Sequence, residues 1–214
     1  MSAESGAGAS ARRRIVLASS NPGKLREFGQ MLSPLGYTVV PQSVLGIADA
    51  EEPHGTFVEN ALAKARHAAR RARLPALADD SGICARALGG APGVHSARYA
   101  ADGAAGIDRT VQDARNNAKL IAMLKDQRDR RAHYYCVIVL LRHADDPEPV
   151  IAEGAWNGEL IDTPRGGNGF GYDPYFLLPD FGRTAAELAP EEKNSISHRG
   201  KALRRLIAKL KEGV

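Results

Sequence analysis

The run Leu77-Ala78-Asp79-Asp80-Ser81-Gly82 joins a short apolar segment directly to two adjacent carboxylates, a hydroxyl and a glycine. This order is typical of a buried strand that ends in a functional loop. Adjacent carboxylates repel each other, so proteins expose them, pair them with cations or use them on a divalent metal. The run alone leaves two interpretations open, an Asp-Ser-Gly turn that caps the next segment and a metal site.

Length and composition indicate one folded domain around this run. The chain has 214 residues, of which 43% are hydrophobic and 25% charged, and this is enough for one sizeable core. Residues 1–11, rich in Ser, Ala and Gly, are predicted to be a disordered extension, and residues 12–214 a single domain. The net charge of +4 favours small anionic ligands over nucleic acid, because acids are spread among the basic residues.

Cysteine content and hydropathy predict the cellular setting. Cys84 and Cys136 are the only cysteines, too few for a disulfide framework or a cysteine-only zinc site, which favours a reducing compartment. The apolar run at residues 15–18 is too short for a signal peptide, and no stretch reaches the length that spans a bilayer. We therefore expect a soluble, cytoplasmic protein without a membrane partner.

The first predicted strand and helix frame a candidate anion-binding loop. Residues 14–18 have the pattern of a buried strand, and residues 25–32 carry apolar side chains at helical spacing. Between them, Ser19-Ser20-Asn21-Pro22-Gly23 and then Lys24 offer hydroxyls, backbone N–H groups and a cation at a helix N-terminus, which suits a phosphate group. The loop is not a Walker A loop, because Leu25 stands where Ser or Thr would bind magnesium. An ordinary turn is the competing interpretation.

Periodicity elsewhere predicts alternating strands and helices. Strands are expected at 37–40, 83–88, 133–141, 150–160 and 175–178, and helices at 56–72, 108–125 and around 203–210. The helix at 108–125 is expected to be scaffold only, with Val111, Ala114, Ala118, Ile121 and Leu124 at helical spacing. Trp156 and Cys136 are expected in the core. Basic side chains on the helix at 56–72 leave nucleic-acid binding as a minor alternative.

A glycine-rich loop at residues 163–174 carries Phe170 and Tyr172. Glycines beside aromatic rings let a planar ligand approach backbone and ring together, as a stacked nucleobase does. A turn anchored by core aromatics is the alternative interpretation.

Cations in two other segments suggest an anionic or carbonyl-bearing ligand. Lys193, His198 and Arg199 place three donors without obvious acidic partners close to one another in the sequence, although a solvated charge run would look the same. Arg98 is expected either to neutralise a phosphate or to pair with a carboxylate of the opening run.

Five separated blocks resemble, in order, those of the inosine triphosphate pyrophosphatase family, in particular its bacterial dITP/XTP pyrophosphatases. The blocks are Ser19–Lys24, Thr56–Ala61, Ala78–Gly82, Gly169–Pro174 and Glu192–Gly200. The resemblance covers nearly the whole chain and implies an α/β fold with a long, twisted mixed β-sheet flanked by helices, and two lobes around a central cleft. Ser19-Ser20 departs from the Thr-Gly that is common in relatives, which bears on how closely the loop wraps phosphates.

The resemblance implies hydrolysis of ITP, dITP and XTP to the monophosphate and pyrophosphate, which would cleanse the nucleotide pool. It makes Asp80 the general base and a Mg²⁺ ligand, with Glu51 as the second ligand and Glu52 as the alternative one residue away. The substrate-binding residues that it implies are Ser19, Ser20, Asn21, Pro22, Gly23, Lys24, Ser81, Phe170, Gly171, Tyr172, Asp173, Lys193, His198 and Arg199. It also implies a homodimer.

The residue chemistry supports an enzyme independently of the family. A triphosphate gains charge at its leaving group as pyrophosphate departs, so Mg²⁺ on carboxylate oxygens together with Lys and Arg is the expected stabiliser. Asp79, Asp80 and Glu51 favour catalysis, because a protein that only binds triphosphate gains little from unpaired acids unless a metal is present. A non-hydrolytic nucleotide-sensing module is the alternative function.

Overall fold

Seven strands form one mixed sheet in the computed structural model, which describes residues 13–101 and 108–213. They are β1 (Arg13–Leu17), β2 (Tyr37–Pro41), β3 (Ala76–Ala85), β4 (Arg131–Leu141), β5 (Val150–Leu160), β6 (Phe176–Leu178) and β7 (Arg183–Thr184). The spatial order is β2-β1-β3-β4-β5-β6-β7. β1 is parallel to β2 and β3, and the pairs from β3 to β7 are antiparallel. The predicted mixed α/β sheet is confirmed, whereas the predicted extension at 1–11 lies outside the described residues.

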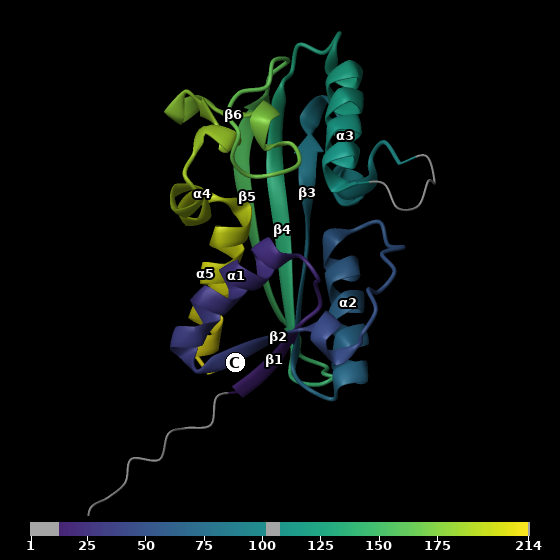
Figure 1. Ribbon diagram of the computed structural model, residues 1–214, viewed down its shortest axis with the longest axis vertical. Helices are drawn as coiled ribbons and strands as arrows, with labels where there is room; N and C mark the ends of the chain where they lie inside the picture. Colours follow the sequence, from purple (N-terminus) through teal and green to yellow (C-terminus); the bar gives the residue numbers. More distant parts are fainter. Residues whose placement is uncertain (1–12, 102–107, 214) are drawn as a thin grey trace, which may run out of the picture.

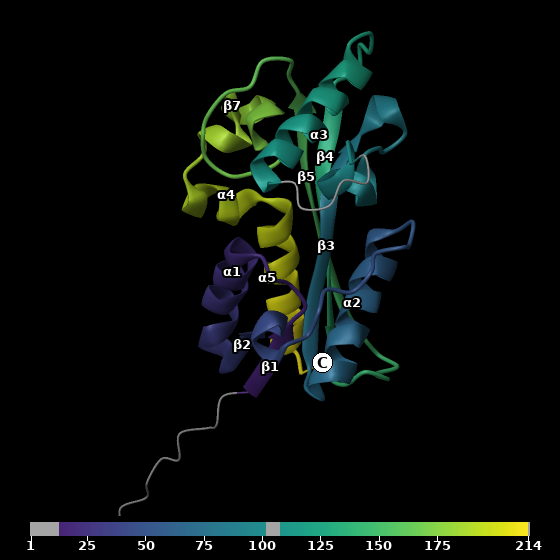
Figure 2. The same cartoon turned by 45° about the vertical axis from the view of Figure 1, so that its right-hand side comes forward.

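Helices cover both faces of this sheet (Figure 1). The α-helices of the described ranges are α1 (Pro22–Leu32), α2 (Phe57–Ala72), α3 (Arg109–Leu124), α4 (Pro190–Ile196) and α5 (His198–Lys211). α1 and α5 lie side by side on one face, and α2 lies on the other (Figures 1 and 2). None of the helices in these ranges is long and apolar enough to cross a membrane.

The core is divided along the long strands β3, β4 and β5. In the lower half, Phe28 of α1 and Leu203 of α5 pack on one face of the sheet, and the alanines of α2 pack on the other. In the upper half, Trp156 and Phe176 pack with Leu120 of α3. The molecule therefore has two lobes that share the same long strands, with α3 and the β6–β7 region at the upper end (Figure 1).

Several local predictions are confirmed by this arrangement. β4 and β5 pair in antiparallel register along most of their length, and Trp156 and Cys136 are buried. The predicted N-cap of α2 is present, since Glu59 N donates to Thr56 Oγ1 at 3.3 Å, and the Glu59 carboxylate accepts from the Thr56 hydroxyl. The small residues Ala61, Ala65 and Ala68 then let α2 lie close against the sheet.

The predicted loop at residues 79–82 is wrong, and so is a separate strand at 83–88. β3 continues from Ala76 to Ala85 and pairs with β4 along its full length, and residues 86–88 form a 3₁₀ turn. The acidic pair therefore lies in the middle of a strand, where backbone groups are satisfied by the ladder and cations balance the carboxylates. Because side chains alternate along a strand, Asp79 and Asp80 face opposite sides of the sheet.

The predicted apolar face of α3 is confirmed at Leu124 and is wrong at Val111, Ala114 and Ala118, which are exposed. Val111 is 46% exposed, whereas Asn116, Asn117, Leu120 and Leu124 are buried. Asn116 replaces an apolar contact with hydrogen bonds, because its Oδ1 accepts from Ala100 N at 2.8 Å and its Nδ2 donates to the backbone of residues 96 and 97. A buried amide that satisfies backbone groups is invisible to a pattern of apolar residues.

Candidate functional site

Two cavities of about 860 and 370 Å³ meet between the lobes. The lower cavity is lined by Ala18–Pro22, Lys24, Gln42, Asp49–Pro53, Lys64, Asp79, Ala97, Arg98 and Arg109. The upper cavity is lined by Lys24, Glu27, Ser81, Gly82, Ser96, Ala97, Arg109, Gln112, Asp113, Tyr134, Phe170–Asp173, Lys193, Asn194 and Ser197–Arg199. Three lining residues, Lys24, Ala97 and Arg109, are common to both, so the two cavities form one continuous cleft.

The loop between β1 and α1 contributes side chains to the lower cavity. Asn21 caps α1, because its Oδ1 accepts from Gly23 N at 2.8 Å and from Lys24 N at 3.3 Å. Those two N–H groups therefore already have a protein partner, and Gly23 does not line either cavity. Ser19, Ser20 and Asn21 of this loop line the lower cavity, and so do Pro22 and Lys24 of the first turn of α1.

Asp79 lies in a buried ion cluster on the α1 and α5 side of β3. The carboxylate is 1% exposed, and Lys24 Nζ lies 2.8 Å and Arg199 Nε 3.3 Å from its oxygens. Burial alone would raise the pKa of Asp79, but Lys24 and Arg199 hold it far below its usual range. Arg199 also reaches Glu27 and Ser81 Oγ, so the cluster ties two helices to the strand.

Asp80 lies on the α2 side of the same strand. Its Oδ1 is 2.9 Å from Lys64 Nζ, and its Oδ2 accepts from Asn60 Nδ2 at 3.4 Å. Burial raises the pKa of Asp80, and the nearby charges of Glu52 and Asp79 act in the same direction against Lys64. Asp80 itself lines neither cavity; Lys64, which contacts it, lines the lower one.

Glu51 and Glu52 have different environments, which the sequence could not separate. Glu52 contacts Lys64 Nζ at 2.6 Å and Arg98 Nη1 at 2.8 Å, and these cations keep its pKa low although burial acts to raise it. Arg98 also donates to Glu52 O at 3.0 Å, so its predicted pairing with Asp79 or Asp80 is wrong. Glu51 is exposed and lines the lower cavity.

The donor chemistry of this wall fits a magnesium ion that is shared with a ligand. Its carboxylates are hard oxygen donors, and the Lys64 ammonium lies between Glu52 and Asp80, which shows that a cation is stable beside them. Within residues 13–101 and 108–213, no three His, Cys, Asp or Glu side chains are grouped to hold a metal by themselves. Mg²⁺ commonly takes one or two carboxylates and completes its shell with water and phosphate oxygens.

The loop after β5 builds the upper cavity, and its two aromatics have different environments. Phe170 is 44% exposed, and Lys193 Nζ lies 4.9 Å from its ring centroid. Tyr172 is buried and donates its hydroxyl to Ser96 O at 2.8 Å. The exposed ring is therefore the one that a ligand can stack on, whereas Tyr172 joins the loop to the 3₁₀ segment Gly93–Arg98.

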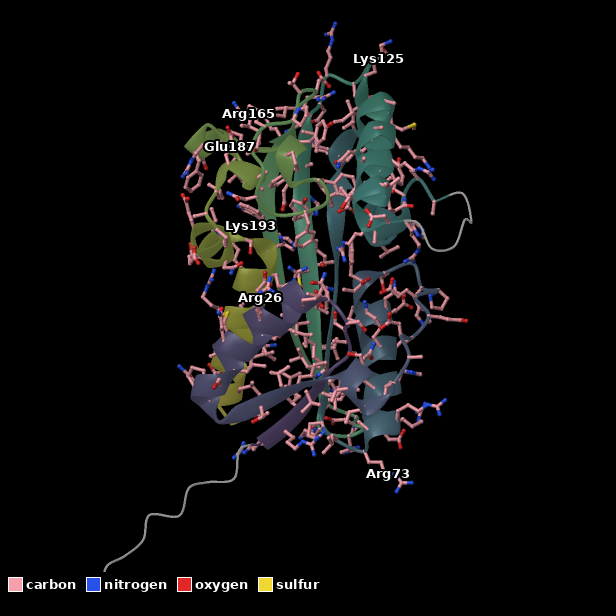
Figure 3. The ribbon with its side chains drawn as sticks, in the orientation of Figure 1. Arg26, Arg73, Lys125, Arg165, Glu187 and Lys193 are labelled. Carbon is pink, nitrogen blue, oxygen red and sulfur yellow. The ribbon has the colours of Figure 1, made fainter. Side chains whose placement is uncertain are left out.

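Asp173 holds the same loop in place through three contacts. It accepts from Phe170 N at 2.9 Å and from Tyr134 OH at 3.1 Å, and it forms an ion pair with Lys193. Figure 3 shows Lys193 at mid-height of the molecule, between α1 and the upper lobe. Lys193 and Arg199 thus have acidic partners, contrary to the expectation from the sequence.

His198 is a buried neutral group in the wall of the upper cavity. Its ring stacks on Tyr134 with centroids 4.7 Å apart and planes 8° apart. Burial, reinforced by the charges of Arg199 and Lys193, places the pKa of His198 well below its usual range. Its Nδ1 is buried and has no hydrogen-bond partner among the residues that the structure describes, so the hydrogen-bonding capacity of this atom is unmet.

α3 supplies site residues that the sequence analysis assigned to scaffold. Asp113 Oδ2 accepts from Gly171 N at 3.1 Å, and Asn117 Nδ2 donates to Gly171 O at 2.9 Å. Arg109, Gln112 and Asp113 line the upper cavity. The available signal was the polar stripe at positions 109, 112, 113, 116 and 117, which recurs at helical spacing.

The cleft brings together nearly all of the predicted residues. The predicted residues of the first loop, except Gly23, line the lower cavity together with Glu51. The predicted residues from Ser81 to Arg199 line the upper cavity. Fold and cleft together define an α/β protein with a two-part site, cationic and acidic at one end and aromatic at the other. The chain belongs to the Ham1 family, whose sequence pattern matches residues 15–209.

Similar proteins agree with this assignment. A dITP/XTP pyrophosphatase of Ralstonia nicotianae is 66% identical over 199 residues, which are 93% of this chain and 97% of that protein. One of Nitrosomonas europaea is 62% identical over 93% of this chain and 95% of its own. The solved structure of a HAM1 protein from Coxiella burnetii has a TM-score of 0.87 at 49% identity and covers 94% of this chain and 100% of that one. The family and fold predicted from the sequence are confirmed.

Proposed function

We propose that the chain hydrolyses the noncanonical purine nucleoside triphosphates ITP, dITP and XTP to the monophosphate and pyrophosphate. The observation that carries the proposal is the continuity of the two cavities, since one ligand with a ring at one end and several phosphates at the other fills both. The curated relatives described above are named dITP/XTP pyrophosphatases, which agrees with the activity predicted from the sequence motifs.

The upper cavity takes the purine base in this proposal. Phe170 offers an exposed ring for stacking, and His198 is neutral with an unpartnered Nδ1. In the Nδ1–H tautomer, His198 donates to the 6-oxo group of hypoxanthine or xanthine. A 6-amino base would leave two donors facing each other in a buried site, which is a large penalty.

The lower cavity takes the triphosphate. Ser19 and Ser20 offer hydroxyls, and Lys24 and Lys64 offer ammonium groups, along its wall. These groups stabilise the charge that builds on the leaving pyrophosphate. Glu51 and Asp80 would hold Mg²⁺, whose chemistry there would be to supply further positive charge beside the phosphates.

Asp80, which is joined to the lower cavity through its contact Lys64, is assigned as the general base on water. The water oxygen forms a bond to the α-phosphorus while the bond from the α-phosphorus to the bridging oxygen breaks, and the water proton passes to Asp80. Asp80 is ionised at neutral pH beside Lys64, so it is in the state that accepts a proton. Lys64 holds this carboxylate in place. Asp79 is ion-paired with Lys24 and Arg199 instead.

One assay tests the proposal. The purified protein is incubated with Mg²⁺ and each of ITP, dITP, XTP, GTP and ATP, and pyrophosphate and orthophosphate are measured separately. We expect pyrophosphate from the first three, and its loss in Asp80→Asn or with EDTA. Orthophosphate alone, or full activity of Asp80→Asn, contradicts the mechanism. Tight binding of ITP without hydrolysis favours the nucleotide-sensing module instead.

Paired variants separate the two candidate metal ligands. Glu51→Gln is expected to raise the Mg²⁺ concentration needed for half-maximal activity, because its carboxylate is exposed to the lower cavity. Glu52→Gln removes an acid that Lys64 and Arg98 already neutralise, so its Mg²⁺ requirement is expected to stay near that of the wild type. The reverse result assigns the metal to Glu52.

Two further parts of the proposal concern the protein in the cell. The family resemblance implies a homodimer, and light scattering coupled to gel filtration tests it. A cytoplasmic location agrees with both cysteines being free thiols, and cell fractionation tests it.

A further inference from the structure

The junction of the two cavities has a cation that the predicted site does not include. Lys24 and Arg109 are the two charged side chains that line both cavities. Lys24 belongs to the predicted phosphate loop and is paired with Asp79. Arg109 is the first residue of α3, and none of the sequence motifs that predict the site includes it.

The Arg109 guanidinium is held by an aromatic ring. Its Cζ lies 5.4 Å from the centroid of the Phe170 ring, within the range of a cation–π contact. Within residues 13–101 and 108–213, no carboxylate is ion-paired with Arg109. Lys193, the other cation on this ring, is already paired with Asp173. The donors of Arg109 thus face the junction without a carboxylate partner among the described residues.

The position of Arg109 at the junction of the two cavities indicates which part of the ligand it contacts. In a nucleotide whose base lies in the upper cavity and whose outer phosphates lie in the lower one, the ribose and the α-phosphate cross the junction. A guanidinium presents a planar fork of donors that matches two oxygens of one phosphate group. We propose that Arg109 is a substrate-binding residue that holds the α-phosphate, and that Phe170 positions its guanidinium. This inference rests on the proposed function.

Binding without catalysis or metal tests it. Isothermal titration calorimetry in EDTA measures the affinity for IMP, which carries the α-phosphate, and for inosine, which does not. Arg109→Ala is expected to weaken IMP binding about tenfold, the loss of one charge-assisted phosphate contact, and to change inosine binding less than about twofold. Arg128→Ala is the matched control, since it removes the same charge from an exposed position that lines neither cavity.

The role of Phe170 is tested by a double-variant cycle. If the ring positions the guanidinium, Arg109→Ala costs less IMP affinity in a Phe170→Leu background than in the wild type. Equal losses for IMP and inosine, or no loss beyond that of Arg128→Ala, overturn the inference while the proposed function stands. A wild-type protein that neither binds IMP nor releases pyrophosphate from ITP overturns both.

Discussion

Asp79 and Asp80 are adjacent in β3, and their carboxylates lie on opposite faces of the sheet. Asp79 meets Lys24 and Arg199 on the α1 and α5 side, whereas Asp80 meets Lys64 on the α2 side. The alternation of a strand thus gives two identical side chains different partners and shifts their pKa values in opposite directions.

We expect the two aspartates to differ in what their loss does to stability. Asp79→Asn leaves Arg199 buried without its main counter-charge, and breaking such a buried pair costs about 3–5 kcal/mol. Asp80→Asn removes a carboxylate that burial disfavours, and Lys64 keeps Glu52 as a partner, so a loss of less than about 1.5 kcal/mol is expected. Urea unfolding of both variants measures this, and equal losses would contradict the division.

His198 predicts a pH dependence of stability. Its pKa in the folded protein is well below the usual value, so the unfolded chain binds a proton first as the pH falls. The stability linked to His198 is therefore present above about pH 6.5 and is lost as the pH falls below it, by about 1.4 kcal/mol at pH 5.5. Urea unfolding at pH 7.5 and 5.5 should show this extra loss in the wild type and not in His198→Gln. If His198→Gln loses as much stability between pH 7.5 and 5.5 as the wild type, His198 is protonated in the folded state at pH 5.5.

Gly154 of β5 is expected to be intolerant of a methyl group. A Cβ at this position would lie 2.2 Å from His198 O and 2.7 Å from Ala202 N, so α5 would have to move away from the sheet. We expect Gly154→Ala to lower the free energy of unfolding by about 1–3 kcal/mol and to reduce activity, because α5 carries His198 and Arg199. Gly29→Ala in α1 is the control, since a Cβ there meets nothing within 4 Å.

A basic stripe on α5 is expected to protect the outer edge of β5. β6 pairs only with Glu159 and Leu160 of that strand. Along the preceding edge, three cations of α5 donate to alternate carbonyls: Lys201 to Ala155 at 3.0 Å, Arg205 to Glu153 at 2.7 Å and Lys209 to Ile151 at 2.7 Å. The spacings match, because four helical residues rise about 6.0 Å and two strand residues about 6.7 Å.

Removing this stripe should promote aggregation, because an uncovered edge can pair with another chain. We expect the triple alanine variant at 201, 205 and 209 to scatter light at a lower temperature on heating than the wild type. The triple alanine variant at Arg66, Arg70 and Arg71 loses the same charge from exposed positions of α2 and is the control. Similar scattering by both variants would attribute the effect to charge alone.

Local sequence patterns were sufficient to predict an element wherever its formation depends on residues that are close in the chain. The Thr56 N-cap and the apolar run of β4 predicted a helix and a strand correctly, because caps and burial depend on residues close in the chain. The loop around Phe170 lines the upper cavity, and ligand binding there stays a prediction. Val111 misled the prediction for α3, because the helix buries Asn116 and Asn117 against backbone groups distant in sequence.

The motifs and their order thus predicted the family and the sheet class correctly, and most of the residues that they singled out line the cleft. Tertiary structure decided which partner each charge has: Glu52 rather than Glu51 is bound by Lys64 and Arg98, Lys193 is paired with Asp173, and Arg109 enters the cleft from α3. The reason is physical. Ion pairs and burial depend on distances between residues that are far apart in the chain, and no local pattern encodes those distances.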